Sequence, residues 1–478
     1  MSVIPIDSHV PPSVEAYEVT VQTEHVRARD GVELATDVYR PSLNGEVVDG
    51  VFPVLLQRTP YNKVEVEHEG GDASCFARHG YISVVQDCRG CFQSGGDVNF
   101  LIPEAEDGAD TVAWIKDQPW CNGRIGTWGT SWAGWTQTAL AALAPESLVT
   151  MVPNMSGSNA HESSVRQGGA MELRFIAWAF WHCASNSQEK LSADFAALNL
   201  GATPFSDWLT RMPIRPGMTQ LSLVPPYERW VFDLLTKADY DEYWKHPSLN
   251  PREHYAKMPD IPILWIGGWY DSYARAAVEN FKDLSELKSS PQHLLMGPWV
   301  HGYTTMEEGF AGDVSFGSEA GIESAQALHL RWFDRWMRGV DNGVDRESRL
   351  QYFAMGGGHG KRDRDGRLFH GGQWRSAETW PPPDIKIVSY YLHEDGSLSP
   401  EIPCENESST TYRFDPDHPV PSCGGSVSSL SEIKPLGPGI SDPTYLSFEG
   451  RMREMMLAGA FDQVEREDMH GCSSPYLP

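Results

Sequence analysis

The sequence predicts an α/β fold, in which a helical cap interrupts a largely parallel sheet and a β-sandwich follows. Three observations predict it. Short segments that are apolar throughout alternate with helical patterns up to about residue 150, a helical stretch rich in aromatic residues follows, and strand patterns then return. Strands without polar alternation are buried on both faces, which is typical of a parallel sheet between two helix layers.

The first part of the core is predicted to cover residues 1–150. Residues 17–40 alternate apolar and polar positions around Arg-Asp-Gly, which indicates a β-hairpin. The strands expected next are the apolar segments 51–57, 81–87, 123–129 and 148–154. The helices expected between them are 104–118, which has acidic residues in its first turn where the helix dipole favours them, and 132–143.

The pattern changes near residue 150, and the segment 151–249 is predicted to be a helical cap. Its Trp, Phe, Leu and Ala residues recur at helical spacing, as in MELRFIAWAFWHCA (171–184). The second part of the core is predicted at 250–345. Its expected elements are strands at 261–271 and 291–300 and a helix at 324–338 that ends at Gly339.

The remaining segment, 346–478, is rich in Gly, Pro and Ser and has few helical patterns. Short strand patterns, such as IKIVSYYLH at 386–393, are separated by turn residues such as WPPPD at 380–384. This texture predicts a partial β-sandwich of the jelly-roll type.

Composition excludes several classes of partner. The chain of 478 residues has 40% hydrophobic residues, as expected for a globular protein of two or three domains. Its formal net charge of -27 disfavours binding to nucleic acid or to an anionic membrane surface. The N-terminal residues show no basic start followed by an apolar run, and we therefore predict a cytoplasmic protein without a membrane anchor.

A serine stands between small residues in GTWGTSWAGWTQTAL (126–140), where a predicted strand turns into a predicted helix. A nucleophilic serine needs such an elbow, because the sharp turn lifts its hydroxyl away from the backbone and passes close to the sheet. Gly129, Ala133 and Gly134 provide the small neighbours, although the common pattern G-x-S-x-G has its second glycine one position earlier. Ser131 is therefore a candidate nucleophile, and an ordinary turn serine is the alternative.

A base and a carboxylate follow in the order that α/β-hydrolases use, which is Ser, Asp, His. The predicted strand ILWIGGWYD ends at Asp271, and the next one, HLLMGPWVHG, leads into His301. Both residues follow the carboxyl ends of parallel strands, the edge at which such sheets bind ligands. We expect His301 to take the proton of Ser131, and Asp271 to hold the imidazole in the required tautomer.

Two groups are candidates to stabilise an oxyanion. The helix that begins after Ser131 directs its first amide groups at the site, which makes the Trp132 N–H one candidate. Tyr61 in RTPYNK lies on the loop after the strand 51–57, where a phenol hydroxyl can replace a second amide. The alternative for Tyr61 is a buried aromatic side chain at the base of the loop.

Other polar residues in these motifs are expected to be structural. His182 lies among the cap aromatics, and Asp87 and Arg89 are expected to brace loops near the site. Cys88 and Cys91 have CxxC spacing, but no second pair accompanies them, and the scattered cysteines fit thiols. We therefore expect no metal site.

Six motifs carry a resemblance to a known family: RTPYNK (58–63), QDCRGCFQSGG (86–96), GTSWAG (129–134), GGWYDSY (267–273), GPWVHG (297–302) and LRWFDRWMRGVDNG (330–343). With them the chain resembles the CocE/NonD hydrolases, which are related to the X-Pro dipeptidyl-peptidases and the α-amino acid ester hydrolases. The resemblance implies an α/β-hydrolase core, a helical cap, a C-terminal jelly roll and acyl-enzyme chemistry without a cofactor. It also implies a triad of Ser131, Asp271 and His301, and an oxyanion hole formed by Tyr61 and the Trp132 N–H.

The chain departs from this family in two places. The family's jelly roll extends beyond the segment that residues 461–478 resemble, so we expect an incomplete sandwich with open strand edges, which association into a homo-oligomer could cover. The acidic residues by which α-amino acid ester hydrolases bind a substrate amine are replaced after Asp271 by SYAR (272–275), which disfavours a free α-amine.

The acyl pocket is instead expected to be apolar and lined by Tyr273, Trp178 and Trp181. For the two tryptophans, plain packing in the cap is the alternative. The sequence thus predicts a serine hydrolase that cleaves a small-molecule carboxylic ester, less favourably an amide, through an acyl-serine intermediate. An X-Pro type dipeptidyl-peptidase, an acyltransferase or thioesterase-like release enzyme of natural-product metabolism, and a catalytically inactive binding homologue stay open.

Overall fold

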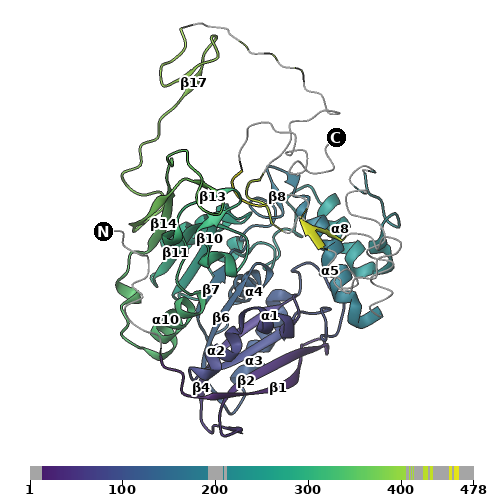
Figure 1. Cartoon of the computed structure of the whole chain (residues 1–478). Helices are drawn as coiled ribbons and strands as arrows, with labels where there is room; N and C mark the ends of the chain where they lie inside the picture. Colours follow the sequence, from purple (N-terminus) through teal and green to yellow (C-terminus); the bar gives the residue numbers. More distant parts are fainter. Residues whose placement is uncertain are drawn as a thin grey trace.

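The structure is a computed structural model, and it describes residues 13–191, 208, 211, 213–404, 409, 411, 413, 424–428, 431–433, 452–454 and 457–461. Its centre is an 11-stranded sheet with the order β1-β2-β5-β4-β6-β7-β10-β11-β14-β16, and β3 pairs with β2 (Figure 1). The strands are β1 (Glu18–Arg27), β2 (Glu33–Leu43), β3 (Glu46–Val47), β4 (Phe52–Thr59), β5 (Ile82–Asp87), β6 (Cys121–Thr130), β7 (Leu148–Asn154), β10 (Ile263–Tyr270), β11 (Gln292–Val300), β14 (Leu350–Met355) and β16 (Gly372–Ala377).

The pairing confirms the predicted α/β class. All neighbours from β5 to β14 are parallel, and the antiparallel pairs of the main path lie toward its two ends. The predicted hairpin around Arg29-Asp30-Gly31 is the antiparallel pair of β1 and β2. Each of the six apolar segments predicted to be strands forms one of the parallel strands, which confirms that uninterrupted apolar character indicates burial on both faces.

Helices cover both faces of the sheet. One face carries α3 (Glu104–Lys116), α4 (Trp132–Ala141) and α9 (Ala274–Leu287), and the other carries α2 (Asp72–Arg78) and α10 (Ala325–Arg338). The alternation along β4 shows the two layers, because Val54 and Leu56 pack under the first set and Leu55 under the second. α10 ends at Gly339 in the left-handed conformation (φ 75°), as predicted. Among the described helices, none has the length and apolar character needed to cross a membrane.

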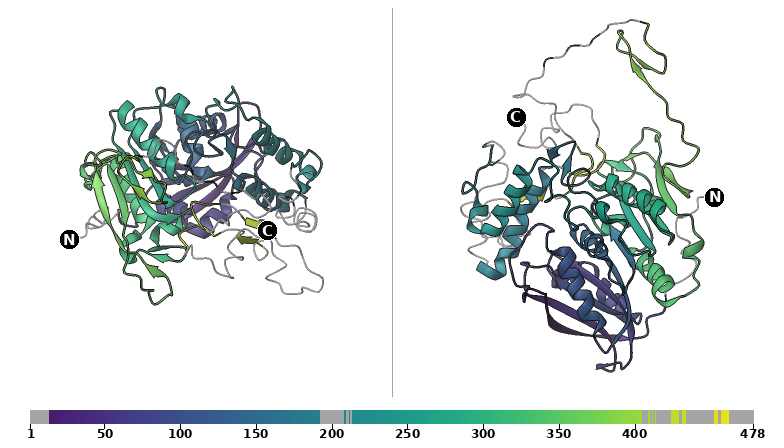
Figure 2. Two further views of the ribbon diagram at one scale, coloured as in Figure 1. Left: turned by 90° about the horizontal axis from the view of Figure 1, so that it is seen from above. Right: turned by 180° about the vertical axis from the view of Figure 1, so that it is seen from behind.

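The segment between β7 and β10 lies over the carboxyl ends of the strands. It contains the pair β8 (Arg166–Gln167) and β9 (Ala170–Met171), and the helices α5 (Arg174–Leu191) and α8 (Pro225–Thr236) (Figure 2). One buried cluster joins its tryptophans Trp178 and Trp230 to Trp132 and Tyr273, which follow β6 and β10. This cap therefore closes over the sheet edge where the predicted catalytic residues lie.

The C-terminal part differs from the prediction. A sandwich was expected to begin at residue 346, but β14 and β16 extend the main sheet, because β14 pairs with β11 and β16 pairs with β14. The strand predicted at 386–393 is reduced to β17 (Tyr391–Leu392), which pairs only with β18 (Leu398–Ser399) and stands apart from the sheet (Figure 1). Much of the predicted sandwich, including 462–478, lies outside the described residues.

The remaining described strands form small sheets near the cap and the site. They are β12 (Phe310–Ala311), β13 (Val314–Ser315), β15 (Leu368–Phe369), β19 (Ser431–Ile433) and β20 (Met452–Glu454). Residues 457–461 return to the core, where Ala460 forms a bridge with Gly312. The C-terminal part thus contacts the loops that follow β10 and β11.

Candidate active site

Ser131 forms the turn between β6 and α4. Its backbone has φ 63° and ψ -121°, a conformation that is costly for a residue with a Cβ. Hydrogen bonds hold it there, from Ser131 N to Asn154 O (3.0 Å) and from Trp135 N to Ser131 O (2.9 Å). The structure therefore contains the strained elbow that the sequence predicted.

The small neighbours of Ser131 are required by close approaches. A Cβ on Gly129 would lie 2.7 Å from Ala133 Cβ, and one on Gly134 would lie 2.9 Å from Asn154 O. Gly129 also has φ +139°, which disfavours any side chain. The second glycine is thus required at position 134, where the helix passes too close to the end of β7 for a Cβ.

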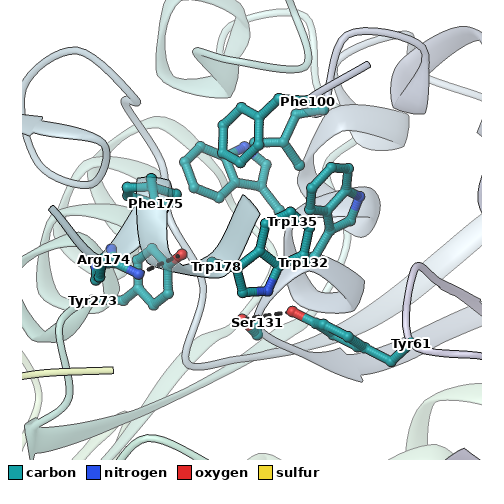
Figure 3. A pocket seen from close by; sticks show the side chains of 10 residues that line it. Tyr61, Phe100, Ser131, Trp132, Trp135, Arg174, Phe175, Trp178 and Tyr273 are labelled. Carbon is teal, nitrogen blue, oxygen red and sulfur yellow. Dashed lines mark hydrogen bonds between the residues drawn. The ribbon is translucent and has the colours of Figure 1, made fainter. Parts of the chain in front are cut away.

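The two predicted oxyanion donors lie together next to Ser131. The Tyr61 hydroxyl donates to Ser131 Oγ at 3.2 Å (Figure 3), and the backbone N–H of Trp132 donates to the Tyr61 hydroxyl. Burial raises the pKa of Tyr61, so its phenol keeps its proton and stays a donor. His182 fixes this loop, because its Nε2 lies 2.6 Å from the carbonyl of Pro60, which fits the structural role expected for it.

Asp271 and His301 are brought together by the sheet register. Tyr270 at the end of β10 is paired with Val300 at the end of β11, so the residues that follow them emerge side by side. His301 Nδ1 lies 2.7 Å from Asp271 Oδ1, and the Asp271 side chain is fully buried. A buried carboxylate at Nδ1 leaves Nε2 as the nitrogen available for proton transfer.

The structure does not join this pair to the serine. Ser131 and His301 are both described, and no hydrogen bond connects them; the Ser131 hydroxyl instead accepts from Tyr61. Tyr273 is close to both Ser131 and the Asp271–His301 pair. Its ring centroid is 5.7 Å from that of His301, and it lines the same cavity as Ser131. Catalytic hydrogen bonds are often long or poorly aligned in the free enzyme and tighten only when substrate binds.

A small cavity opens beside Ser131 (Figure 3). Its lining residues are Tyr61, Phe100, Leu101, Ser131, Trp132, Trp135, Arg174, Phe175, Trp178 and Tyr273. Trp178 and Tyr273 therefore lie where the sequence placed them. Trp181 does not line the cavity; it lies one turn further along α5, with its ring 6.3 Å from that of Tyr61.

Arg174 was missed by sequence reasoning. It is the first residue of α5 and its side chain is 6% exposed, with its guanidinium 4.5 Å from the centre of the Tyr273 ring. The signal that could have found it is a single cation in the otherwise apolar run LRFIAWAFW (173–181), because a buried charge needs a specific reason.

A buried ionic network supports the floor of the site. Trp132 Nε1 donates to Glu104 Oε1 at 2.9 Å, and Glu104 Oε2 pairs with Arg58 at 2.7 Å. Burial raises the pKa of the Glu104 carboxyl, and the Arg58 charge opposes this shift. Glu104 was expected only as an acidic residue in the first turn of a helix.

Asp87 and Arg89 brace loops, as expected. Asp87 accepts from the amides of Lys63 (2.8 Å) and Gln93 (3.2 Å), while Arg89 pairs with Asp107 at 2.6 Å. These contacts tie the loops after β4 and β5 to α3.

Comparisons with known proteins agree with this arrangement. Residues 30–303 match the family of X-Pro dipeptidyl-peptidases (S15 family). Cocaine esterase of Rhodococcus sp. (strain MB1 Bresler) is 30% identical over 425 residues, which cover 84% of this chain and 68% of that enzyme.

Two solved structures show the same fold. An aminopeptidase from a marine sediment Thaumarchaeota archaeon has a TM-score of 0.61 at 20% identity, over 90% of this chain and 69% of that one. An α-amino acid ester hydrolase has a TM-score of 0.59 at 21% identity, over 87% of this chain and 69% of that one. The chain thus spans somewhat more than two thirds of each of these proteins.

Proposed function

Since this chain belongs to the X-Pro dipeptidyl-peptidase family (S15 family), we propose that it is a serine hydrolase that cleaves carboxylic esters through an acyl-serine intermediate. One observation carries the proposal: the strained Ser131 at the β6–α4 elbow accepts a hydrogen bond from the hydroxyl of the partly buried Tyr61 at the mouth of an aromatic cavity. A turn serine without a catalytic role has no need of such a donor.

The acylation step follows from the positions of the polar groups. Ser131 Oγ attacks the ester carbonyl carbon while His301 Nε2 takes the hydroxyl proton, and Asp271 stabilises the imidazolium that forms. The carbonyl oxygen becomes an anion that the Tyr61 hydroxyl and the Trp132 N–H bind. When the tetrahedral intermediate collapses, the carbon–oxygen bond to the alcohol breaks and His301 returns the proton to that oxygen.

Deacylation repeats the sequence with water. His301 takes a proton from a water molecule, whose oxygen attacks the acyl carbon, and the second tetrahedral intermediate uses the same two donors. Its collapse breaks the bond to Ser131 Oγ, which regains its proton from His301. The acid is released and the free enzyme is restored.

The cavity favours an ester with an uncharged acyl end or an anionic one over an X-Pro peptide. A dipeptidyl-peptidase must bind the N-terminal ammonium of its substrate on the acyl side, which requires a carboxylate. The residues that line the cavity include none, and they include the cation Arg174. The family's description keeps the peptidase as the second candidate.

Covalent labelling tests the proposed function. A fluorophosphonate probe should label the wild type and should not label Ser131→Ala, and hydrolysis of p-nitrophenyl butyrate should be lost in the same variant. Ser83→Ala is a matched control, because Ser83 is buried in β5 away from the site. Labelling that persists in Ser131→Ala would refute the assignment. Faster turnover of Xaa-Pro-p-nitroanilides than of esters would select the peptidase.

We also propose that the protein acts in the cytoplasm. Support comes from the described cysteines, since Cys88 keeps a thiol that donates to Glu104 Oε2 at 3.4 Å and Cys75 and Cys121 are free thiols too. Cell fractionation of the native host tests this, and recovery in the exported fraction would contradict it.

A further inference from the structure

Two hollows lie on the two sides of the proposed catalytic residues. Ser131 lines the first one but His301 does not, whereas His301 lines the second together with Asp313, Ser428 and Phe461 among others. The alcohol oxygen must be within reach of the imidazole that protonates it, while the acyl carbon is bonded to Ser131. The cavity at Ser131 is therefore the acyl pocket, an assignment that rests on the proposed function.

The walls of the acyl pocket carry a single charged side chain. Besides Arg174, its lining residues are aromatic or uncharged, and three of them are tryptophans. The counter-ion of Arg174 is Glu172, which pairs with Nε and does not line the pocket. Within the described pocket, a substrate group that enters thus meets a cation and no anion.

The partners of Arg174 leave capacity for a ligand. Nη1 donates to the Tyr273 hydroxyl and to Ser428 Oγ, both at 3.2 Å, and Nη2 donates to the Ser164 carbonyl at 3.0 Å. A guanidinium has two N–H groups on each Nη nitrogen, so one on Nη2 is not used by these bonds. The two hydrogen bonds of Nη1 are long, and their acceptors are neutral hydroxyl oxygens. A carboxylate can take the place of these acceptors and form stronger, charge-assisted bonds.

We infer that the acyl pocket selects acyl groups whose remote end is a carboxylate, with Arg174 as the specificity-determining residue. The aromatic walls bury the carbon chain, and the planar guanidinium fork fits the two oxygens of a carboxylate. An ammonium at the same end is repelled by Arg174 and finds no carboxylate on the pocket wall.

Three p-nitrophenyl esters of similar length test the inference. They are the monoester of adipic acid, the 6-methylheptanoate, whose isopropyl end has the shape of a carboxylate, and the 6-aminohexanoate. The expected kcat/KM of the wild type is at least about tenfold higher for the adipate monoester than for the 6-methylheptanoate, and it is lowest for the 6-aminohexanoate. All assays use a constant 0.15 M ionic strength, which screens the protein's net charge to the same degree for each ester, and the spontaneous rate is subtracted.

Variants assign the preference to one side chain. Arg174→Met should abolish the preference for the carboxylate end. Arg166→Met is the matched control, because Arg166 is also a buried arginine of the cap but does not line the pocket, and it should keep the preference. Glu172→Gln removes the counter-ion while sparing the pocket wall, and it should increase the preference even if Arg174→Met does not fold.

The outcomes separate this inference from the proposed function. If the wild type hydrolyses all three esters with equal kcat/KM, or prefers the isopropyl end, the inference is wrong and the ester hydrolase stands. If no ester is turned over, the proposed function fails. Quenching of the pocket tryptophans in Ser131→Ala then still tests the pocket, because the adipate monoester must bind more tightly than the 6-methylheptanoate.

Discussion

The change Tyr61→Phe removes one hydroxyl group and tests the proposed oxyanion hole. That hydroxyl is 3.2 Å from Ser131 Oγ, and the aromatic ring is held by Trp178 and Trp181, with centroid distances of 6.5 and 6.3 Å. Phenylalanine keeps these ring contacts. We therefore expect the variant to fold as the wild type does, with the Trp132 N–H as the remaining donor.

The expected loss of activity follows from the charge that develops on the carbonyl oxygen. Removing one donor of an oxyanion hole lowers kcat by about 10²–10³, or roughly 2.7–4 kcal/mol. The variant also removes the ground-state hydrogen bond to Ser131 Oγ, which stabilises the free enzyme by about 1 kcal/mol and acts in the opposite direction. The net loss should thus lie near 10² and appear in kcat more than in KM.

Steady-state hydrolysis of p-nitrophenyl butyrate, together with thermal unfolding, measures this effect. Tyr81→Phe is the matched control, because the Tyr81 hydroxyl is also buried and donates to Asp334 at 2.7 Å, but it lies on the other side of the sheet. The control should lower the unfolding temperature and leave kcat nearly unchanged. If Tyr61→Phe kept kcat within about threefold of the wild type while remaining folded, the assignment of Tyr61 to the oxyanion hole would be refuted.

Three further predictions concern the triad, the elbow and the pH dependence of stability. Asp271→Asn should lower kcat about 10⁴-fold, since an amide favours the wrong imidazole tautomer, and a loss below tenfold in the same assay would argue against the triad. Gly134→Ala should lower the calorimetric unfolding temperature. The new Cβ would lie 2.7 Å from Ser156 Cβ, which costs about 1–3 kcal/mol and outweighs the roughly 1 kcal/mol gained in helix propensity. The control Gly357→Ala should leave the unfolding temperature unchanged, because a Cβ there has no atom within 4 Å. Burial raises the pKa of Asp87 from 3.8 to about 7, so the folded state holds a proton that the unfolded state has lost. The free energy of unfolding should therefore fall as the pH rises from about 4 to about 7, by up to about 1.4 kcal/mol per pH unit. Denaturant titrations of Asp87→Asn should show a smaller slope with pH, and a slope equal to that of the wild type would contradict this prediction.

The strands and the catalytic candidates could be predicted because their signals are short-range or follow from topology. The elbow needs small residues next to Ser131 in the sequence, and the close approaches of Gly129 and Gly134 show why. Asp271 and His301 could be paired because residues that follow neighbouring parallel strands meet at one edge, and the register of Tyr270 with Val300 places them there.

The errors arose where a role depends on distant contacts. The boundary at residue 346 was wrong because the isolated strand pattern of β14 does not show that it pairs with β11. Trp181 was placed in the acyl pocket because helical spacing does not fix which turn of α5 faces the cavity. Glu104 was predicted only as an acidic residue in a first helical turn, and its burial against Trp132 and Arg58 depends on residues distant in the sequence.

The sequence by itself determined the alternating α/β core, the elbow at Ser131 and the order of the candidate triad, because backbone sterics and apolar periodicity act over a few residues. Only the tertiary structure decided what surrounds the serine. Arg174 reaches the pocket because its side chain is held by Ser164 of the cap, by Tyr273 after β10 and by Ser428 of the C-terminal part. A buried charge is stabilised by the sum of such contacts, and that sum exists only when the segments are folded together.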